Sequence, residues 1–280
     1  MNNPELTSGT LTVHRDGPLY YVCFPAFEKT GLVRHLYSTR RGGVSQGYLG
    51  SMNLGFNRGD SMDNVLENYR RICFSSGIYP GDMVFSDQIH RDVVLAVDGR
   101  DRGKGMTRPK EMEGVDALVT DTPQVCLVTT HADCAALFFL DPVRKAIGLA
   151  HAGWKGTAME IGRKTVEKMT ECYGCDPKDI LAGISPSIGP CCFEVDVDVA
   201  SIFESMFPEW AEDIILPGKA PEKAQIDLWE TNRRILLKAG LREENIAVTD
   251  LCTMCQEEYF HSHRRMGKKR GTQMAFLELI

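Results

Sequence analysis

The chain has 280 residues, a length typical of one large domain or two small ones. Hydrophobic residues at 43% and charged residues at 25% are ordinary for a globular protein, which excludes the disordered, collagen-like and coiled-coil classes. The formal net charge of -6 provides no overall positive field, so we expect neither nucleic acid nor an anionic membrane as a partner.

The sequence also lacks the usual signals for export or membrane insertion. Its first residues show no basic start followed by an apolar run, and its most apolar stretch, residues 124–140, is shorter than the roughly 20 residues of a membrane span. We therefore expect a cytoplasmic protein whose ten cysteines are mostly thiols. The Cys172/Cys175 and Cys252/Cys255 pairs are too far apart for a zinc ribbon, with its spacing of roughly 15 to 20 residues, so we expect ordinary thiols there.

Hydrophobic spacing indicates a mixture of helices and strands, without internal repeats. In chain order we expect a strand at 19–24, a helix between Asp63 and Gly77, a strand at 124–130, strands at 137–140 and 146–150, a helix between Thr157 and Gly174, a helix between Asp227 and Gly240, and a strand at 273–279. Thr157 and Glu160 are spaced as a capping box, which predicts a helix start there. We interpret the chain as one domain over 1–280, with 1–18 as a loose N-terminal extension and 216–223 as an excursion within the domain.

The strands at 137–140 and 146–150 flank Asp141-Pro142-Val143-Arg144, where Asp and Pro favour a type I turn. If the turn closes a four-residue loop, Leu140 pairs with Lys145, and the same register places Cys134 opposite His151. Opposed side chains lie about 4.5 to 5.5 Å apart, so this thiolate and imidazole would share one zinc ion. A three-residue loop would instead put them on opposite faces.

Other histidines are needed to complete such a site. His131 lies on the opposite face from Cys134 if the strand is unbroken, so it is the weaker ligand candidate. His90 precedes a β-branched run and is the preferred third ligand. Two alternatives stay open: Cys134 and His151 are ordinary core residues, or they form a cysteine hydrolase dyad in which His151 takes the thiol proton.

Basic residues near these positions are candidates for phosphate binding. Lys155 follows Gly153 in a segment where small residues suit either close approach to a phosphate or a tight strand-to-helix turn. Arg264 and Arg265 lie in the basic segment 261–271, which is either an arginine clamp on phosphate or a solvated turn.

Several blocks occur in a fixed order: STRRGGVSQGY, MNLGFNRGD, DNVLENYRR, DQIH, VDALVTDTP, HADC, FFLDPVRKAIGLAHAGWKGT, GISPSIGPCCFEV and LCTMCQEEYFHSHRR. Together, over about residues 35–279, they resemble the laccase-domain proteins of the YfiH type. This family was formerly described as multicopper polyphenol oxidases, and its members are purine nucleoside phosphorylases with adenosine deaminase activity. Arg91, Ala136 and Met266 stand where the family commonly has Gly, Pro and an acidic residue.

The resemblance implies an α+β fold, a single-domain four-layer α/β/β/α sandwich with mixed sheets. It also implies one zinc ion per chain, held by His90, Cys134 and His151, which are then the catalytic and metal residues. Three protein ligands leave a fourth position for water or substrate, as in catalytic zinc sites. Copper is an unlikely cofactor, because seven histidines are too few for several copper centres.

The implied reaction is phosphorolysis of adenosine, inosine, guanosine and methylthioadenosine to base and ribose 1-phosphate, together with adenosine deamination. The partners are then small-molecule nucleosides and phosphate. Candidate substrate residues are Arg40, Lys155 and Arg264 for phosphate, and Asn53 and Gln88 for base or ribose. The alternatives are a zinc-independent hydrolase using Cys134 and His151, a binding protein with structural zinc, and a polyphenol oxidase. A monomer and a homodimer are both compatible with the sequence.

Overall fold

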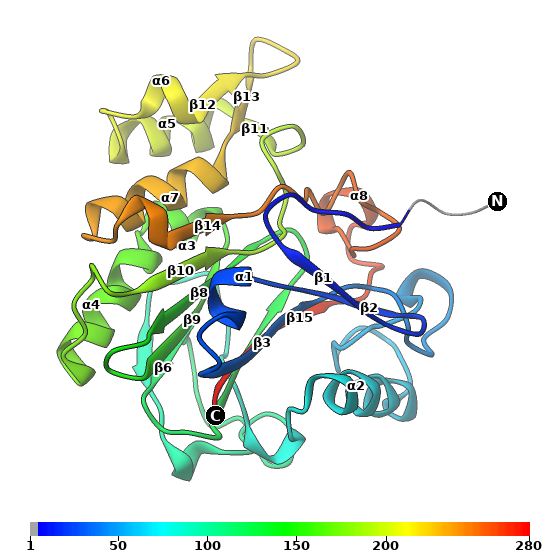
Figure 1. The fold of residues 1–280 in the computed structure, drawn as a ribbon. Helices are drawn as coiled ribbons and strands as arrows, with labels where there is room; N and C mark the ends of the chain where they lie inside the picture. The colour runs from blue at the N-terminus through cyan, green and yellow to red at the C-terminus, as the bar shows by residue number, and fades with distance from the viewer. Residues whose placement is uncertain (1–4) are drawn as a thin grey trace.

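Two six-stranded β-sheets packed face to face form the centre of the computed structural model, which describes residues 5–280 (Figure 1). The first sheet, in spatial order, contains β1 (Thr12–Asp16), β2 (Leu19–Cys23), β3 (Val33–Ser38), β15 (Gln273–Leu279), β7 (Cys126–His131) and β4 (Met83–Phe85). The second contains β14 (Ile246–Val248), β10 (Leu181–Ile184), β8 (Ala135–Asp141), β9 (Ala146–Ala152), β6 (Ala117–Thr120) and β5 (Val94–Ala96). Both sheets are mixed, because β4–β7, β5–β6 and β10–β14 pair in parallel while their other neighbours pair antiparallel.

Helices cover the outer faces of the two sheets. The helices are α1 (Pro25–Glu28), α2 (Met62–Ser76), α3 (Trp154–Ala158), α4 (Ile161–Tyr173), α5 (Val197–Met206), α6 (Ala211–Ile214), α7 (Leu228–Lys238) and α8 (His263–Met266), with short 3-10 turns at Gly47–Leu49, Pro80–Asp82, Gly99–Asp101 and Glu243–Asn245. The apolar side of α2 packs on the first sheet, and α4 and α7 pack on the second. The layers therefore follow the order α/β/β/α, and the predicted α+β fold class is confirmed.

Local sequence signals account for the ends of the predicted helices. The Ser61 side chain accepts a hydrogen bond from the Asn64 amide at the start of α2, and Gly77 ends that helix with φ 71°. The Asp227 side chain accepts from the Trp229 and Glu230 amides at the start of α7. No helix in the described part of the chain is long and apolar enough to cross a membrane.

Strand β8 is buried on both faces, which explains why residues 135–140 of its sequence are all apolar. Phe138 and Leu140 face the first sheet, while Leu137 and Phe139 face the helical layer. Phe138 packs edge-on against Phe24, with ring centroids 5.2 Å apart. This doubly covered strand and its partner β9 give the candidate site a rigid base.

A smaller sheet lies beyond α7, with α5 and α6 beside it (Figure 1). It consists of β11 (Glu194–Asp196), β13 (Lys223–Ile226) and β12 (Ile215–Pro217). A separate apolar cluster that includes Phe203, Phe207 and Ile226 holds it together and joins it to α7. Most of the segment 216–223 forms the turn between β12 and β13.

Two expectations for local structure are wrong. Residues 5–18 are not a loose extension, because β1 pairs with β2 and both Leu6 and Leu11 are buried; residues 1–4 of the predicted extension lie outside the described part of the chain. Thr157 does not cap a helix either: it lies within α3, fully buried, where its hydroxyl accepts a hydrogen bond from the Asn232 side chain at 3.1 Å. Helix α4 begins only at Ile161, after Glu160 with φ 56°.

Candidate metal centre

The three predicted ligands His90, Cys134 and His151 meet at one point of the structure. One ligand atom from each lies within 4.8 Å of the other two. The rings of His90 and His151 are nearly perpendicular, with centroids 4.7 Å apart. His151 is buried in β9, Cys134 precedes β8, and His90 lies exposed in the loop before β5, so the cluster is open on the His90 side.

The hairpin that brings Cys134 near His151 has a different register from the predicted one. Leu140 pairs with Ile147 and His151 pairs with Ala136, a displacement of two residues. Asp141 causes this displacement: its backbone stays in β8 while its side chain accepts from the Val143 and Arg144 amides at 2.8 and 2.9 Å. Because side chains alternate with period two, an even displacement leaves the predicted face of His151 unchanged.

The segment between β7 and β8 places Cys134 and removes His131 from the ligand set. The strand is not continuous there, because Asp133 has φ 86° and turns the chain. His131 is buried, and its two ring nitrogens lie 2.7 Å from the Thr129 hydroxyl and 3.0 Å from the Cys134 carbonyl. Both nitrogens are therefore used within the protein.

Asp116 fixes the position of both histidine ligands. One carboxylate oxygen lies 2.8 Å from His151 Nδ1, which leaves Nε2 for the centre. The same carboxylate accepts from the amides of Ile89, His90 and Arg91, at 3.2, 3.1 and 2.8 Å. These bonds hold the loop in which His90 has φ 61°. A carboxylate behind a ligand histidine is the usual support of protein metal sites.

The electrostatics of the cluster suit a bound cation. Burial, together with the neighbouring His151, lowers the pKa of His90, so its ring is neutral near pH 7, as a ligand requires. Burial alone would lower the pKa of His151, but Cys134 and Asp116 outweigh it and raise that pKa to about 9. The thiol and the carboxylate thus favour positive charge at the point where the ligand atoms meet.

A cavity of about 620 Å³ opens from the cluster. Gln88, Lys155 and Arg264 line it together with the three ligands, as do Arg58 and Arg270. Apolar side chains, including Ile188, Phe193 and Leu228, also line it. The cavity has the size of an ordinary small-molecule site and is lined by both cationic and aromatic side chains, with the Arg264 guanidinium 5.4 Å from the centre of the Phe193 ring.

The basic residues differ in how much of their hydrogen-bonding capacity is free. Lys155 is exposed and forms no ion pair within residues 5–280; its Nζ lies 5.4 Å from the centre of the Trp154 ring. Arg264 Nη1 donates to the Cys192 and Glu194 carbonyls. Arg58 Nε donates to the Thr272 hydroxyl, and Arg270 Nε to His263.

Two of the predicted substrate residues do not line the cavity. Asn53 is fully buried, and its side-chain oxygen accepts from the Gly55 and Thr272 amides. Arg40 donates to the carbonyls of Gly50 and Glu257. Gln88 does line the cavity, but its amide is paired with the backbone of Thr130. These side chains stabilise loops.

Sequence reasoning missed Asp116, Asp133, Arg58 and Arg270. Asp133 is buried and accepts hydrogen bonds from Thr253, Ser262 and the Arg264 amide, so it holds the C-terminal segment over the cavity. Asp116 lies within the block VDALVTDTP and Arg58 within MNLGFNRGD, so these blocks could have identified both residues as candidates. Nothing in the sequence spacing pointed to Arg270, because its approach to Arg58 depends on the tertiary fold.

Comparisons with known proteins identify the family of this chain. A family model described as "Multi-copper polyphenol oxidoreductase laccase" matches residues 34–280. The chain is 39% identical over 242 residues to purine nucleoside phosphorylase YlmD of Bacillus subtilis (strain 168), covering 86% of each protein. It is 33% identical over 238 residues to adenosine deaminase RL5 of an unknown prokaryotic organism, covering 84% of this chain and 90% of that protein.

A solved structure shares the fold. The crystal structure of Bacillus licheniformis hypothetical protein YfiH matches with a TM-score of 0.89 and 33% identity, covering 96% of this chain and 99% of that one. The resemblance drawn from the sequence blocks is therefore confirmed. The chain belongs to the multi-copper polyphenol oxidoreductase laccase family.

Proposed function

We propose that this protein is a zinc-dependent purine nucleoside phosphorylase that also deaminates adenosine. The observation that carries the proposal is the meeting of His90, Cys134 and His151 in the lining of a cavity that also has cationic side chains. The names of the relatives support both reactions. The implied substrates are adenosine, inosine, guanosine and methylthioadenosine.

The donor set fits zinc better than the copper of the family description. Two imidazoles and one thiolate are common zinc ligands, and three protein ligands leave one position open. A blue copper site has a similar His₂Cys set but usually a long axial methionine, and no methionine among residues 5–280 lines this cavity. A bound zinc ion supplies a Lewis acid that lowers the pKa of water toward neutrality.

Side chains of this protein would orient the metal ligands and bind the phosphate and the purine. Asp116 orients His151 and the His90 loop. In phosphorolysis, a phosphate oxygen bonds to the anomeric carbon of the ribose while the carbon–nitrogen bond breaks and its electron pair leaves with the purine. Lys155, Arg58 and Arg270 line the cavity and would bind and orient the phosphate. Phe193 offers an apolar surface for the purine.

Substrate assays with and without phosphate test this proposal. Purified protein is incubated with adenosine, inosine or methylthioadenosine, and released base and ammonia are followed by chromatography. We expect base release that requires phosphate, and conversion of adenosine to inosine that does not. Absence of base release from all three nucleosides in the presence of phosphate would refute phosphorolysis.

A second candidate function is suggested by the hydrogen bonds that connect Cys134, His151 and Asp116 in series. His151 hydrogen-bonds to Cys134 and, through Nδ1, to Asp116, which is the order of nucleophile, base and orienting carboxylate in cysteine hydrolases. Chelation separates the two functions: a cysteine hydrolase keeps its activity without metal, whereas the proposed phosphorylase loses it and regains it with zinc. Copper retention together with phenol oxidation would instead favour a polyphenol oxidase.

We further propose a cytoplasmic location and a single functional domain over residues 1–280. All ten cysteines, which lie within the described residues, are free thiols, as a reducing compartment maintains them. The small sheet with α5 and α6 shares its apolar cluster with α7 and contributes Val195 to the cavity wall. The site therefore needs both parts of the chain.

A further inference from the structure

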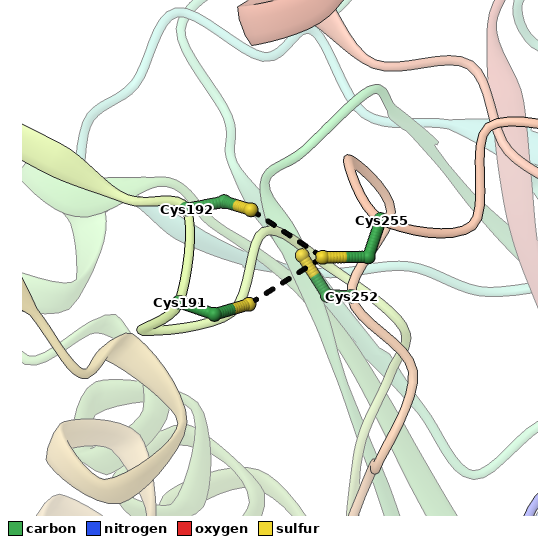
Figure 2. A group of neighbouring side chains, drawn as sticks. All are labelled: Cys191, Cys192, Cys252 and Cys255. Carbon is green, nitrogen blue, oxygen red and sulfur yellow. Dashed lines mark hydrogen bonds between the residues drawn. The ribbon is translucent and has the colours of Figure 1, made fainter.

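Four cysteines that the proposed reaction does not use lie together beside the cavity. Cys191 and Cys192 are in the loop between β10 and β11, and Cys252 and Cys255 are in the segment after β14 (Figure 2). One sulfur from each lies within 4.8 Å of the other three. The two segments run side by side here, joined by a parallel bridge between Ser187 and Cys252.

The sulfur of Cys255 lies at distances from two of the other sulfurs that are close to those of a tetrahedral metal site. Cys255 Sγ lies 3.4 Å from Cys192 Sγ and 3.6 Å from Cys191 Sγ. Zinc–sulfur bonds of about 2.3 Å place the corners of a tetrahedron about 3.8 Å apart, close to this spacing. Bonded disulfide sulfurs lie about 2.05 Å apart, and all four cysteines are free.

The backbone around Cys252 is arranged to stabilise a thiolate. Its sulfur accepts a hydrogen bond from the Gly189 amide at 3.2 Å and further hydrogen bonds from the Met254 and Cys255 amides. Amides two and three residues after the first cysteine thus point back at its sulfur, so Cys252-Thr-Met-Cys255 forms a tight turn around one corner of the cluster. Four sulfur donors without an oxygen ligand favour zinc over magnesium or calcium.

We propose that Cys191, Cys192, Cys252 and Cys255 bind one structural Zn²⁺ ion, distinct from the centre at His90, Cys134 and His151. Four thiolate ligands close the tetrahedron, so this site has no open position for substrate. On binding, the thiol protons pass to solvent and four sulfur–zinc bonds form, without any change of oxidation state. The proposal does not depend on the proposed enzymatic reaction.

The site would fasten the two segments that form one wall of the cavity. Ile188 and Phe193, on either side of the Cys191–Cys192 pair, line the cavity. On the other segment, Thr253 donates to Asp133 at 2.7 Å, and Asp133 in turn accepts from the Arg264 amide. A zinc ion at the four cysteines would therefore hold the Phe193 surface and Arg264 in place without touching substrate.

Zinc content of the purified full-length protein tests the proposal. The protein is prepared with reductant, dialysed against metal-free buffer and assayed for zinc by mass spectrometry. Variants are Cys191→Ser combined with Cys255→Ser, Cys134→Ser, and the matched control Cys172→Ser, which replaces an exposed cysteine on α4. We expect two zinc ions per chain in the wild type and the control, and a loss of one in each of the other two variants.

The outcomes separate the two sites. If the double variant loses one zinc while Cys134→Ser loses none, the four-cysteine site stands and the centre in the proposed function fails. If the double variant folds, by circular dichroism, and keeps the wild-type zinc content, the structural site is refuted. Cobalt substitution of the Cys134→Ser protein adds a spectroscopic check, because strong sulfur-to-cobalt absorption must appear and must be lost when Cys191→Ser and Cys255→Ser are added together. A disulfide within the cluster in place of zinc in the reduced preparation would also overturn the proposal.

Discussion

Asp116 accepts hydrogen bonds from the loop that contains His90 and lies 2.8 Å from His151 Nδ1, so it positions both candidate histidine ligands. The variant Asp116→Asn replaces one acceptor oxygen with an NH₂ group. That side chain can no longer accept from all three loop amides and His151 Nδ1. We expect Asp116→Asn to weaken zinc binding roughly 10- to 100-fold, the usual effect of losing such a support. Competition with a zinc chelator measures this loss, and unchanged affinity would show that Asp116 does not position the ligands.

Gly153 lies against the ligand atoms with no room for a side chain. A Cβ there would come within 2.8 Å of His90 Nδ1 and 3.0 Å of Cys134 Sγ. Its φ of -71° suits any residue, so the effect of a substitution is steric. Because displacement of a reacting group by about 1 Å costs up to about 100-fold in rate, we expect Gly153→Ala to lower kcat by at least about 10-fold.

A stability measurement serves as the control for that variant. Urea unfolding of metal-free Gly153→Ala protein should give a free energy close to that of the metal-free wild type, since the backbone conformation suits alanine and the atoms that the Cβ would meet are ends of the His90 and Cys134 side chains, which can move when no metal holds them. Full activity of Gly153→Ala would contradict the placement of the three ligands around this glycine.

At the scale of elements, the segment after α8 brings Arg270 beside Arg58 at the cavity. Burial and the neighbouring Arg58 lower the pKa of Arg270 to about 10, which reflects a cation that lacks a full counter-charge. A phosphate dianion would supply that charge. We expect Arg270→Gln to raise the KM for phosphate at least about 10-fold, since each lost charge-assisted hydrogen bond is worth about 1.5 to 3 kcal/mol.

Deamination needs no phosphate, so its KM for adenosine should change little in Arg270→Gln. Lys269→Gln is the matched control, because Lys269 is exposed in the same segment and does not line the cavity. An equal rise in KM for phosphate in both variants would show a general charge effect in place of a binding role for Arg270.

The elements also show which features a sequence can reveal. Helix α7 was predicted because its N-cap, Asp227, is a local signal. Helix α2 was predicted to follow Asp63, whereas its N-cap is Ser61, two residues earlier; its end at Gly77 agrees with the prediction. The β8–β9 hairpin was predicted but its register was not, because the Asp141 side chain extends the strand by one residue before the turn. The predicted register was wrong by two residues, and a displacement of two leaves each side chain on the same face of the sheet. His151 therefore still lies near Cys134, as predicted.

At the scale of the whole molecule, the four layers bury several histidines. Burial lowers the pKa of His35 to about 4 and the pKa values of His131 and His261 well below the ordinary value. His35 Nε2 accepts a hydrogen bond from the Phe24 amide at 2.8 Å, which requires the neutral ring. Such residues resist protonation in the folded state but not in the unfolded state.

This difference predicts a loss of stability in mild acid. Above pH 6.5, His35 is neutral in both states and contributes no pH dependence. As the pH falls from 6.5 toward 4, only the unfolded state binds the proton, so the free energy of unfolding decreases, by up to about 3 kcal/mol from this residue.

The variant His35→Gln isolates that contribution. Glutamine can still accept from the Phe24 amide but does not titrate, so urea unfolding should show a shallower pH dependence between pH 6.5 and 4.5 than in the wild type. His263→Gln, at an exposed histidine, should keep the wild-type slope. An unchanged slope in His35→Gln would contradict the assigned pKa shift.

The features that the sequence did not reveal are those that depend on distant segments meeting. The four-cysteine cluster was missed because Cys252 and Cys255 were compared with Cys172 and Cys175, whereas their neighbours in space are Cys191 and Cys192. Arg58 and Arg270 reach one cavity only through the pairing of β15 with β7 and the loop before α2. The three-ligand centre was accessible because its blocks are specific and two of its ligands belong to one hairpin.

Release of hypoxanthine from inosine, with the zinc content measured on the same samples, tests the link between the three-ligand centre and phosphorolysis most directly. Wild-type protein is compared with Cys134→Ser, before and after chelation and after addition of zinc. We expect phosphate-dependent release by the wild type that disappears on chelation and returns with zinc, and none by Cys134→Ser. Undiminished release by Cys134→Ser, or by fully metal-free wild type, would contradict the role assigned to the centre.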